Sequence, residues 1–183
     1  MRDVPLRLSE AQARFAQLLA RRRVPLGFAA AGLTLVLARP TWEAWWVGLV
    51  VAIAGECVRV WAAGHLEKGR EVTRSGPYRF VRHPLYAGSV LIAAGAVVAS
   101  RSRAAAVVAG LYIGLTIVAA LRTEEAQLRQ AFGSTYDDYR ASRAEPMVRH
   151  FSVARAMRNR EYRAVMGVFA GFVLLALKIL ALL

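Results

Sequence analysis

The sequence contains one cysteine, Cys57, and few acidic residues, and both shortages limit what the protein can be. A single thiol cannot form a disulfide within the chain, so a disulfide-rich scaffold is excluded. Only 12 Asp and Glu stand against 25 Lys and Arg, which gives a formal net charge of +13. Hydrophobic residues make up 57% of the chain, whereas soluble domains contain about 45–50%. This apolar content excludes a disordered chain.

Several catalytic and metal-binding signatures are also missing. There is no Gly-rich phosphate loop, no Ser–His–Asp order and no zinc-ligand spacing. The sequence has enough histidines for a three-histidine metal site: His65, His83 and His150. Their spacing matches no metal-binding pattern. We therefore predict no metal. The alternation typical of β-strands is absent as well.

Five apolar runs account for the hydrophobic content: 24–38, 42–63, 85–100, 104–121 and 164–183. The second, fourth and fifth reach the roughly 20 residues that span a bilayer, while the first and third are shorter and depend on their flanks. Backbone groups in lipid must bond to one another, so such runs form helices. We predict one all-α domain over 1–183, a polytopic membrane bundle of about five transmembrane helices.

Basic residues are distributed unevenly around these runs. Segments 1–23, 64–84 and 122–163 carry 20 Lys and Arg, against 3 in the short connections on the other side. The positive-inside rule then places the N-terminus and both long loops in the cytoplasm, and we expect an integral protein of the bacterial inner membrane. Its charge faces lipid head groups, so no nucleic-acid partner is expected. The sequence leaves the oligomeric state open.

The apolar runs also divide the chain into three segments. Segment 1–23 is predicted to be an amphipathic surface helix, 55–145 the core, and 146–183 a basic segment with the last helix. A cleaved signal peptide ending at Ala38 is the alternative for the first run. GxxxG pairs, which favour close helix packing, occur in the fourth and fifth runs at Gly110/Gly114 and Gly167/Gly171.

His83 marks the first chemical constellation, in the loop before the third run. Pro84 follows it and can start a helix, so His83 lies at the helix mouth where backbone N–H groups are free. Tyr86 and Gly88 follow within about one turn, and such a helix N-terminus suits an anion. The alternative is a head-group contact by His83, with Arg79 and Arg82 as ordinary membrane anchors.

Two adjacent carboxylates, Glu124 and Glu125, form the second constellation at the end of the fourth run. A helix C-terminus prefers cations, so either the helix continues into the cytosol or the pair binds something positive. Leu128 and Phe132 extend the apolar stripe and favour a longer helix, which could still deliver a glutamate to a pocket.

The third constellation, Glu56 and Arg59, lies inside the second run, where ionisable side chains are costly and are functional by default. A mutual ion pair between these residues is the alternative to a role in a site.

These motifs resemble those of a known family. Gly76 to Gly88 contains Arg82-His83-Pro84-x-Tyr86-x-Gly88, which is similar to a signature of integral-membrane methyltransferases. Glu124-Glu125 followed by Phe132-Gly133-x-x-Tyr136-x-x-Tyr139 resembles their second block, and Arg59-x-Trp61-Ala62 a weaker upstream element. The family is that of isoprenylcysteine carboxyl methyltransferases and phospholipid methyltransferases. The resemblance covers about residues 55–145.

The resemblance implies a cofactor, S-adenosylmethionine, bound on the cytosolic side between the two blocks. Carried over, its site would be lined by residues of the first block, Tyr78, Arg82, His83, Tyr86 and Gly88. Glu124 and Glu125 would bind the polar end of the cofactor.

The resemblance also implies a lipophilic methyl acceptor that enters from the bilayer. The carboxylate of an isoprenylcysteine-like molecule is the leading expectation. Arg140, Arg143 or Arg59 would hold a carboxylate, whereas an amine acceptor such as an amino phospholipid would need a base, Glu56 or Glu125. A related NADPH-dependent membrane reductase is the other enzyme class. After Tyr139 the sequence departs from the family pattern, which leaves the acceptor open.

Overall fold

The computed structural model describes residues 10–145 and 147–182. Residues 1–9, 146 and 183 lie outside this part, as do the side chains of residues 10–21 and 23. The amphipathic face expected in segment 1–23 falls on these residues and stays a prediction.

The described chain is all-helical, as predicted. Its elements are α1 (Glu10–Leu37), α2 (Trp42–Ala63), the 3-10 helix η1 (Gly76–Arg79), α3 (Pro84–Ser100), α4 (Arg103–Phe132), α5 (Ser134–Arg140), α6 (Val153–Arg158) and α7 (Tyr162–Leu182). By length and composition α2, α4 and α7 can cross a membrane, while Val24–Leu37 and α3 are shorter apolar helices. The three long helices are those of the second, fourth and fifth runs.

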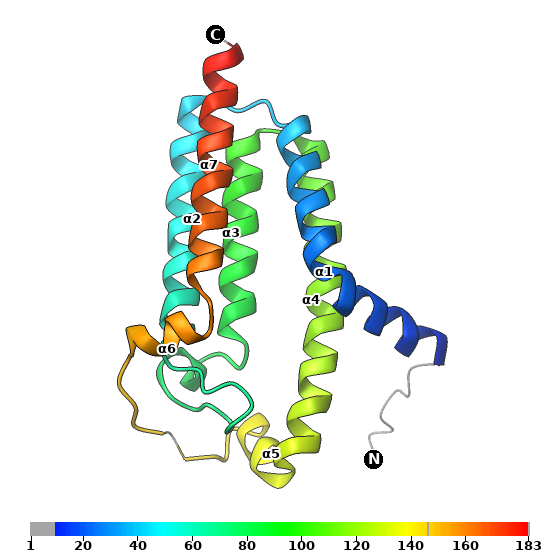
Figure 1. The fold of residues 1–183 in the computed structure, drawn as a ribbon, viewed down its shortest axis with the longest axis vertical. Helices are drawn as coiled ribbons and strands as arrows, with labels where there is room; N and C mark the ends of the chain where they lie inside the picture. Colours follow the sequence, from blue (N-terminus) through cyan, green and yellow to red (C-terminus); the bar gives the residue numbers. More distant parts are fainter. Residues whose placement is uncertain (1–9, 146, 183) are drawn as a thin grey trace.

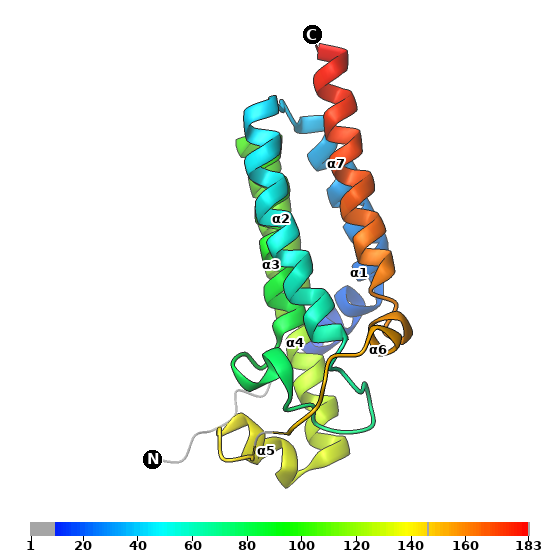
Figure 2. The same ribbon diagram turned by 90° about the vertical axis from the view of Figure 1, so that its left-hand side faces the viewer.

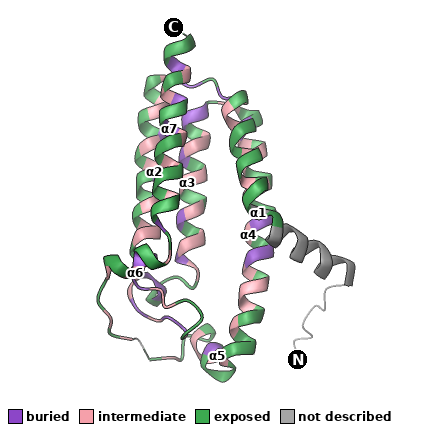
Figure 3. Cartoon of the chain, viewed as in Figure 1, coloured by how far each residue is buried: buried purple, intermediate pink, exposed green. Residues whose placement is uncertain are grey.

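In Figure 1 the helices form two groups that run side by side, and the quarter turn in Figure 2 separates α7 from α2 and α3. α2 packs on α3 and α7, and α1 packs along α4. One end of the bundle, called the loop end, carries η1, α5, α6 and the long loops, whereas the opposite end carries the short connections (Figure 1). Most of the helical surface is exposed or half-buried (Figure 3), as expected for helices whose outer faces contact lipid.

Glycines determine how closely α2 and α3 approach. Gly48 faces Gly95, and Gly55 faces Gly88, where an added Cβ would lie 2.6 Å from the carbonyl oxygen of Gly55. Small residues at such points let helix backbones approach in membranes. The close packing predicted for the GxxxG pairs of α4 and α7 is wrong within the described chain, because a Cβ at any of those four glycines meets nothing within 4 Å.

Polar contacts tie α7 to the rest of the bundle. Lys178 Nζ donates to the carbonyl oxygens of Leu35 and Val36 at 2.7 and 2.8 Å, near the C-terminus of α1. The indole N–H of Trp45 donates to the carbonyl oxygen of Phe172 at 2.8 Å. Lys178 therefore satisfies backbone carbonyls that the end of a helix leaves free.

Replacing this lysine tests that role. We expect Lys178→Met to lower the free energy of unfolding by about 1–2 kcal/mol, the usual cost of losing charge-assisted hydrogen bonds to a helix end. Denaturant unfolding of the detergent-purified protein measures the change. Lys68→Met, at an exposed position, is the control and should leave stability unchanged; an equal effect of both would contradict the role.

Candidate functional site

His83 and Glu125 meet at the loop end, although they lie 42 residues apart in the chain. His83 precedes α3 as its N-cap residue, and its Nε2 lies 3.5 Å from Glu125 Oε1. Glu125 is on α4, which continues unbroken to Phe132. The longer helix favoured by the apolar stripe is thus confirmed, and it delivers a glutamate to the first motif.

Three tyrosines, on η1 and α5, lie at the same end of the bundle. The Tyr139 hydroxyl donates to the carbonyl oxygen of Tyr78 at 2.8 Å and so fastens α5 to η1. Tyr136 is only 1% exposed, and its buried hydroxyl has no hydrogen-bond partner among the described residues. Because buried hydroxyls are normally hydrogen-bonded, this oxygen is a candidate contact for a ligand.

The glutamates affect the tyrosines electrostatically. Burial raises the pKa of Tyr78 well above its usual value, and the nearby Glu124 raises it further. Burial likewise raises the pKa of Tyr136, with a smaller contribution from Glu125. Both phenols therefore stay protonated at neutral pH and can each donate a hydrogen bond to a ligand. These effects also show that Glu124 lies near Tyr78 and Glu125 near Tyr136.

Two arginines at the site have no acidic partner among the residues that the structure describes. Arg82 and Arg140 are exposed, and their positive charges act on the Tyr136 hydroxyl. Arg143, the other basic candidate of this region, pairs with Asp138 at 3.1 Å. Arg82 and Arg140 are thus available to an anionic group. Tyr86 packs near His83, with 6.0 Å between the ring centroids.

Gly88 on α3 and Arg59 on α2 face each other where these two helices pack. A Cβ on Gly88 would come within 2.5 Å of Arg59 Cγ, so helix packing by itself explains the glycine. The Arg59 guanidinium pairs with Glu161 (Nε to Oε1, 2.6 Å). It also donates to the Ser89 hydroxyl at 2.5 Å and to the Leu85 carbonyl oxygen at 3.3 Å.

The mutual ion pair considered for Glu56 and Arg59 is therefore replaced by one with Glu161, a residue that the motifs did not single out. Glu161 is 6% exposed and directly precedes α7. It is the only acid in the basic stretch from 147 to 163, and that isolation is the signal that could have identified it. Both Glu56 carboxylate oxygens are buried without a hydrogen-bond partner among the described residues.

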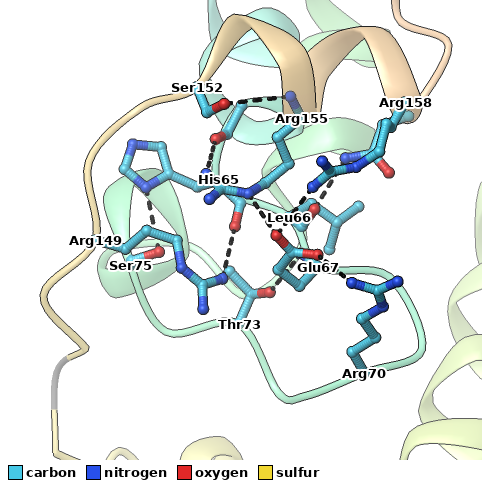
Figure 4. Close-up of polar contacts among 12 residues, drawn as sticks. His65, Leu66, Glu67, Arg70, Thr73, Ser75, Arg149, Ser152, Arg155 and Arg158 are labelled. Carbon is cyan, nitrogen blue, oxygen red and sulfur yellow. Dashed lines mark hydrogen bonds and ion pairs between the residues drawn. The ribbon is translucent and has the colours of Figure 1, made fainter.

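The basic segment after Tyr139 folds back onto the loop that follows α2 (Figure 4). Arg149 binds Glu71 with two hydrogen bonds, at 2.6 and 2.9 Å. Arg155 binds Glu67 at 2.7 Å, and its hydrogen bond lowers the pKa of that carboxyl. The segment thus fixes the loop that leads to η1 and His83.

A largely apolar groove of about 480 Å³ lies between α2 and α7. Its lining residues are Leu49, Ile53, Glu56, Cys57, Val60, Trp61, Phe151, Val165, Val168 and Phe169. Glu56 is its single charged residue. A second cavity, of about 360 Å³, is formed by residues 147–151 with Trp61, His65 and part of η1. Neither cavity includes His83 or Glu125.

The tyrosine cluster predicts a loss of stability in alkali. Burial raises the pKa of Tyr139 from 10.0 to about 12. Because the folded protein keeps this phenol protonated to a higher pH than the unfolded chain does, its contribution is complete below pH 10 and disappears between pH 10 and about 12. Unfolding curves across this range should show the decline, and Tyr139→Phe should make it shallower. An unchanged decline in the variant would contradict this assignment.

Part of the sequence is similar to known proteins. The model of the phospholipid methyltransferase family matches residues 45–135, which contain His83, Glu124 and Glu125. The chain belongs to this family of integral-membrane methyltransferases. Two rice proteins, from Oryza sativa subsp. indica and subsp. japonica, are each named probable protein-S-isoprenylcysteine O-methyltransferase and are 32% identical over 123 residues. Each match covers 58% of this chain and 64% of the relative, so the chain spans less than two thirds of their length. No solved structure is significantly similar to it.

Proposed function

We propose that this member of the family transfers a methyl group from S-adenosylmethionine to a lipophilic acceptor at the cytosolic face of a membrane. The contact between His83 and Glu125 carries the proposal, because it unites the two sequence blocks in one site. The concentration of basic residues at the loop end supports a cytosolic position.

The residues present suit such a cofactor, which supplies a methyl group already activated on a sulfonium. Glu124 and Glu125 are carboxylates for its ammonium group or ribose hydroxyls. The buried Tyr136 hydroxyl is an unsatisfied donor close to Glu125, and Arg82 can face the carboxylate of the methionine part. His83 and Tyr86 form the wall at the mouth of α3. The site's main task is then to hold the acceptor in line with the methyl group.

For the acceptor, the names of the rice relatives support the carboxylate of an isoprenylcysteine-like molecule. Arg140 is the candidate that best suits a carboxylate, because it has no acidic partner among the described residues, whereas Arg59 is bound to Glu161. No general base is required for this reaction. An amine acceptor, as in an amino phospholipid, is the second candidate and is favoured by the unpaired Glu56, with Glu125 as the other possible base.

The experiment that tests the function offers the purified protein S-adenosylmethionine labelled on its methyl group together with a total membrane lipid extract. We expect label to enter a lipid-soluble product, whose identification names the acceptor. Oxidation of NADPH by the protein, without transfer of label, would instead support the membrane reductase.

A further inference from the structure

A charge imbalance lies at the start of α7, beside the groove between α2 and α7. Arg59 has two acidic neighbours there, Glu161 and Glu56, whose charges all act on one another. It pairs with Glu161 at 2.6 Å, while both Glu56 carboxylate oxygens are buried and unbonded among the described residues. The cluster thus holds one acid more than it holds bases.

Arg59 forms its ion pair with Glu161 and not with Glu56. Residues three positions apart on a helix can form an ion pair, so without Glu161 the nearest acid to Arg59 would be Glu56. In the structure the guanidinium is turned toward α7 and α3 instead, where Ser89 and Leu85 complete its hydrogen bonds. With Arg59 bound to Glu161, the Glu56 carboxyl group faces the groove without an arginine partner.

That groove is suited to an amphiphile with one particular kind of head group. Nine of its ten lining residues are uncharged and mostly apolar, which fits a hydrocarbon chain, and the tenth is Glu56. An unpaired carboxylate inside a membrane is costly, and an N–H-bearing or ammonium head group relieves the cost by binding it. A carboxylate head group would instead bring a second acid beside Glu56.

We propose that Glu161 is a specificity-determining positioning residue. By holding Arg59 it leaves Glu56 to bind the ammonium or N–H head group of a lipophilic molecule whose chain lies between α2 and α7. The inference rests on the proposed function and deepens it, since it selects the second of the two acceptor candidates, the amine, over the carboxylate. Glu161 and α7 lie outside residues 45–135, so this arrangement depends on the part of the chain beyond the family match.

The test compares two photoreactive amphiphiles with the same chain, a long-chain alkyl amine and the matching alkyl carboxylate, each with a diazirine in its chain. The full-length protein is reconstituted in lipid nanodiscs and irradiated, and labelled peptides of α2 and α7 are quantified by mass spectrometry. One ion pair formed away from water corresponds to about tenfold in binding, so the amine should label the groove about tenfold more than the carboxylate. Equal labelling, or a preference for the carboxylate, would overturn the proposal.

Substitutions separate the roles of the two acids. Glu56→Gln and Glu161→Gln should both abolish the preference for the amine, the second because Arg59 then pairs with Glu56. Glu43→Gln, at an exposed acid near the opposite end of α2, is the matched control and should keep it. If Glu161→Gln retained the preference and only lowered the melting temperature, its role would be structural and the inference wrong. If a variant fails to fold, the comparison of the two amphiphiles on the unmutated protein still tests whether the groove prefers the amine.

Binding of S-adenosylhomocysteine, measured on the same preparations, keeps the two proposals apart. If the unmutated protein does not bind it, the proposed function fails whatever the labelling shows. If it binds and the labelling shows no preference, the inference about Glu161 alone fails.

Discussion

His83→Ala is expected to weaken the binding of S-adenosylhomocysteine, the product of the methyl donor, by about tenfold, which corresponds to about 1.4 kcal/mol. His83 lies 3.5 Å from Glu125 and holds the mouth of α3 against α4. Its removal takes away one wall of the site and frees the Glu125 side chain. Glu125→Gln should cost a similar factor, because it loses the same contact together with a carboxylate for the ligand.

The double variant gives the sharper result. Because the two side chains act as one unit, the losses should not add, and His83→Ala with Glu125→Gln should bind little worse than either single variant. Isothermal titration calorimetry measures all three affinities. Glu145→Gln, at an exposed position, is the control and should bind like the unmutated protein. Fully additive losses would show that the two residues contribute separately.

Gly48→Leu is expected to have the largest effect on stability, about 2–3 kcal/mol or more, which is typical of overpacking a close interface. A Cβ at this position would meet the carbonyl oxygen of Gly95 and lie 2.7 Å from the backbone nitrogen of Ala99. Backbone atoms cannot turn aside as a flexible side chain can, so α2 and α3 would have to separate. His83 at the start of α3 would move with them.

The matched control is Gly114→Leu on α4, where an added Cβ meets nothing within 4 Å. We expect it to leave the unfolding transition of the purified protein nearly unchanged. The prediction is contradicted if the two variants have the same free energy of unfolding, or if Gly114→Leu lowers it more than Gly48→Leu does. Such a result would mean that α4 makes a close helix contact beyond this chain.

Much of this architecture was predictable from the sequence, because length and hydrophobicity alone determine where helices form in lipid. The helix start at Pro84 follows from local chemistry, and the structure has it. The meeting of His83 with Glu125 was predicted as well, from a resemblance in two motifs rather than from any local rule.

What the sequence did not reveal depends on contacts between distant segments. GxxxG spacing pointed to Gly110 and Gly167, whereas the glycines that pack are Gly48 with Gly95 and Gly55 with Gly88. These are seven residues apart on each helix, a spacing that becomes informative only once the antiparallel pairing of α2 and α3 is known. Glu161 illustrates the same limit, because its partner Arg59 is 102 residues away.

Calorimetric titration of the unmutated, detergent-purified protein with S-adenosylhomocysteine, beside a parallel titration with NADPH, tests the central claim most directly. The claim is that the loop end of the bundle holds a site for a sulfonium nucleotide between His83 and the glutamates of α4. It predicts saturable one-to-one binding of S-adenosylhomocysteine and none of NADPH. Binding of NADPH but not of S-adenosylhomocysteine would contradict the claim. The absence of a heat of binding for both compounds would contradict it as well.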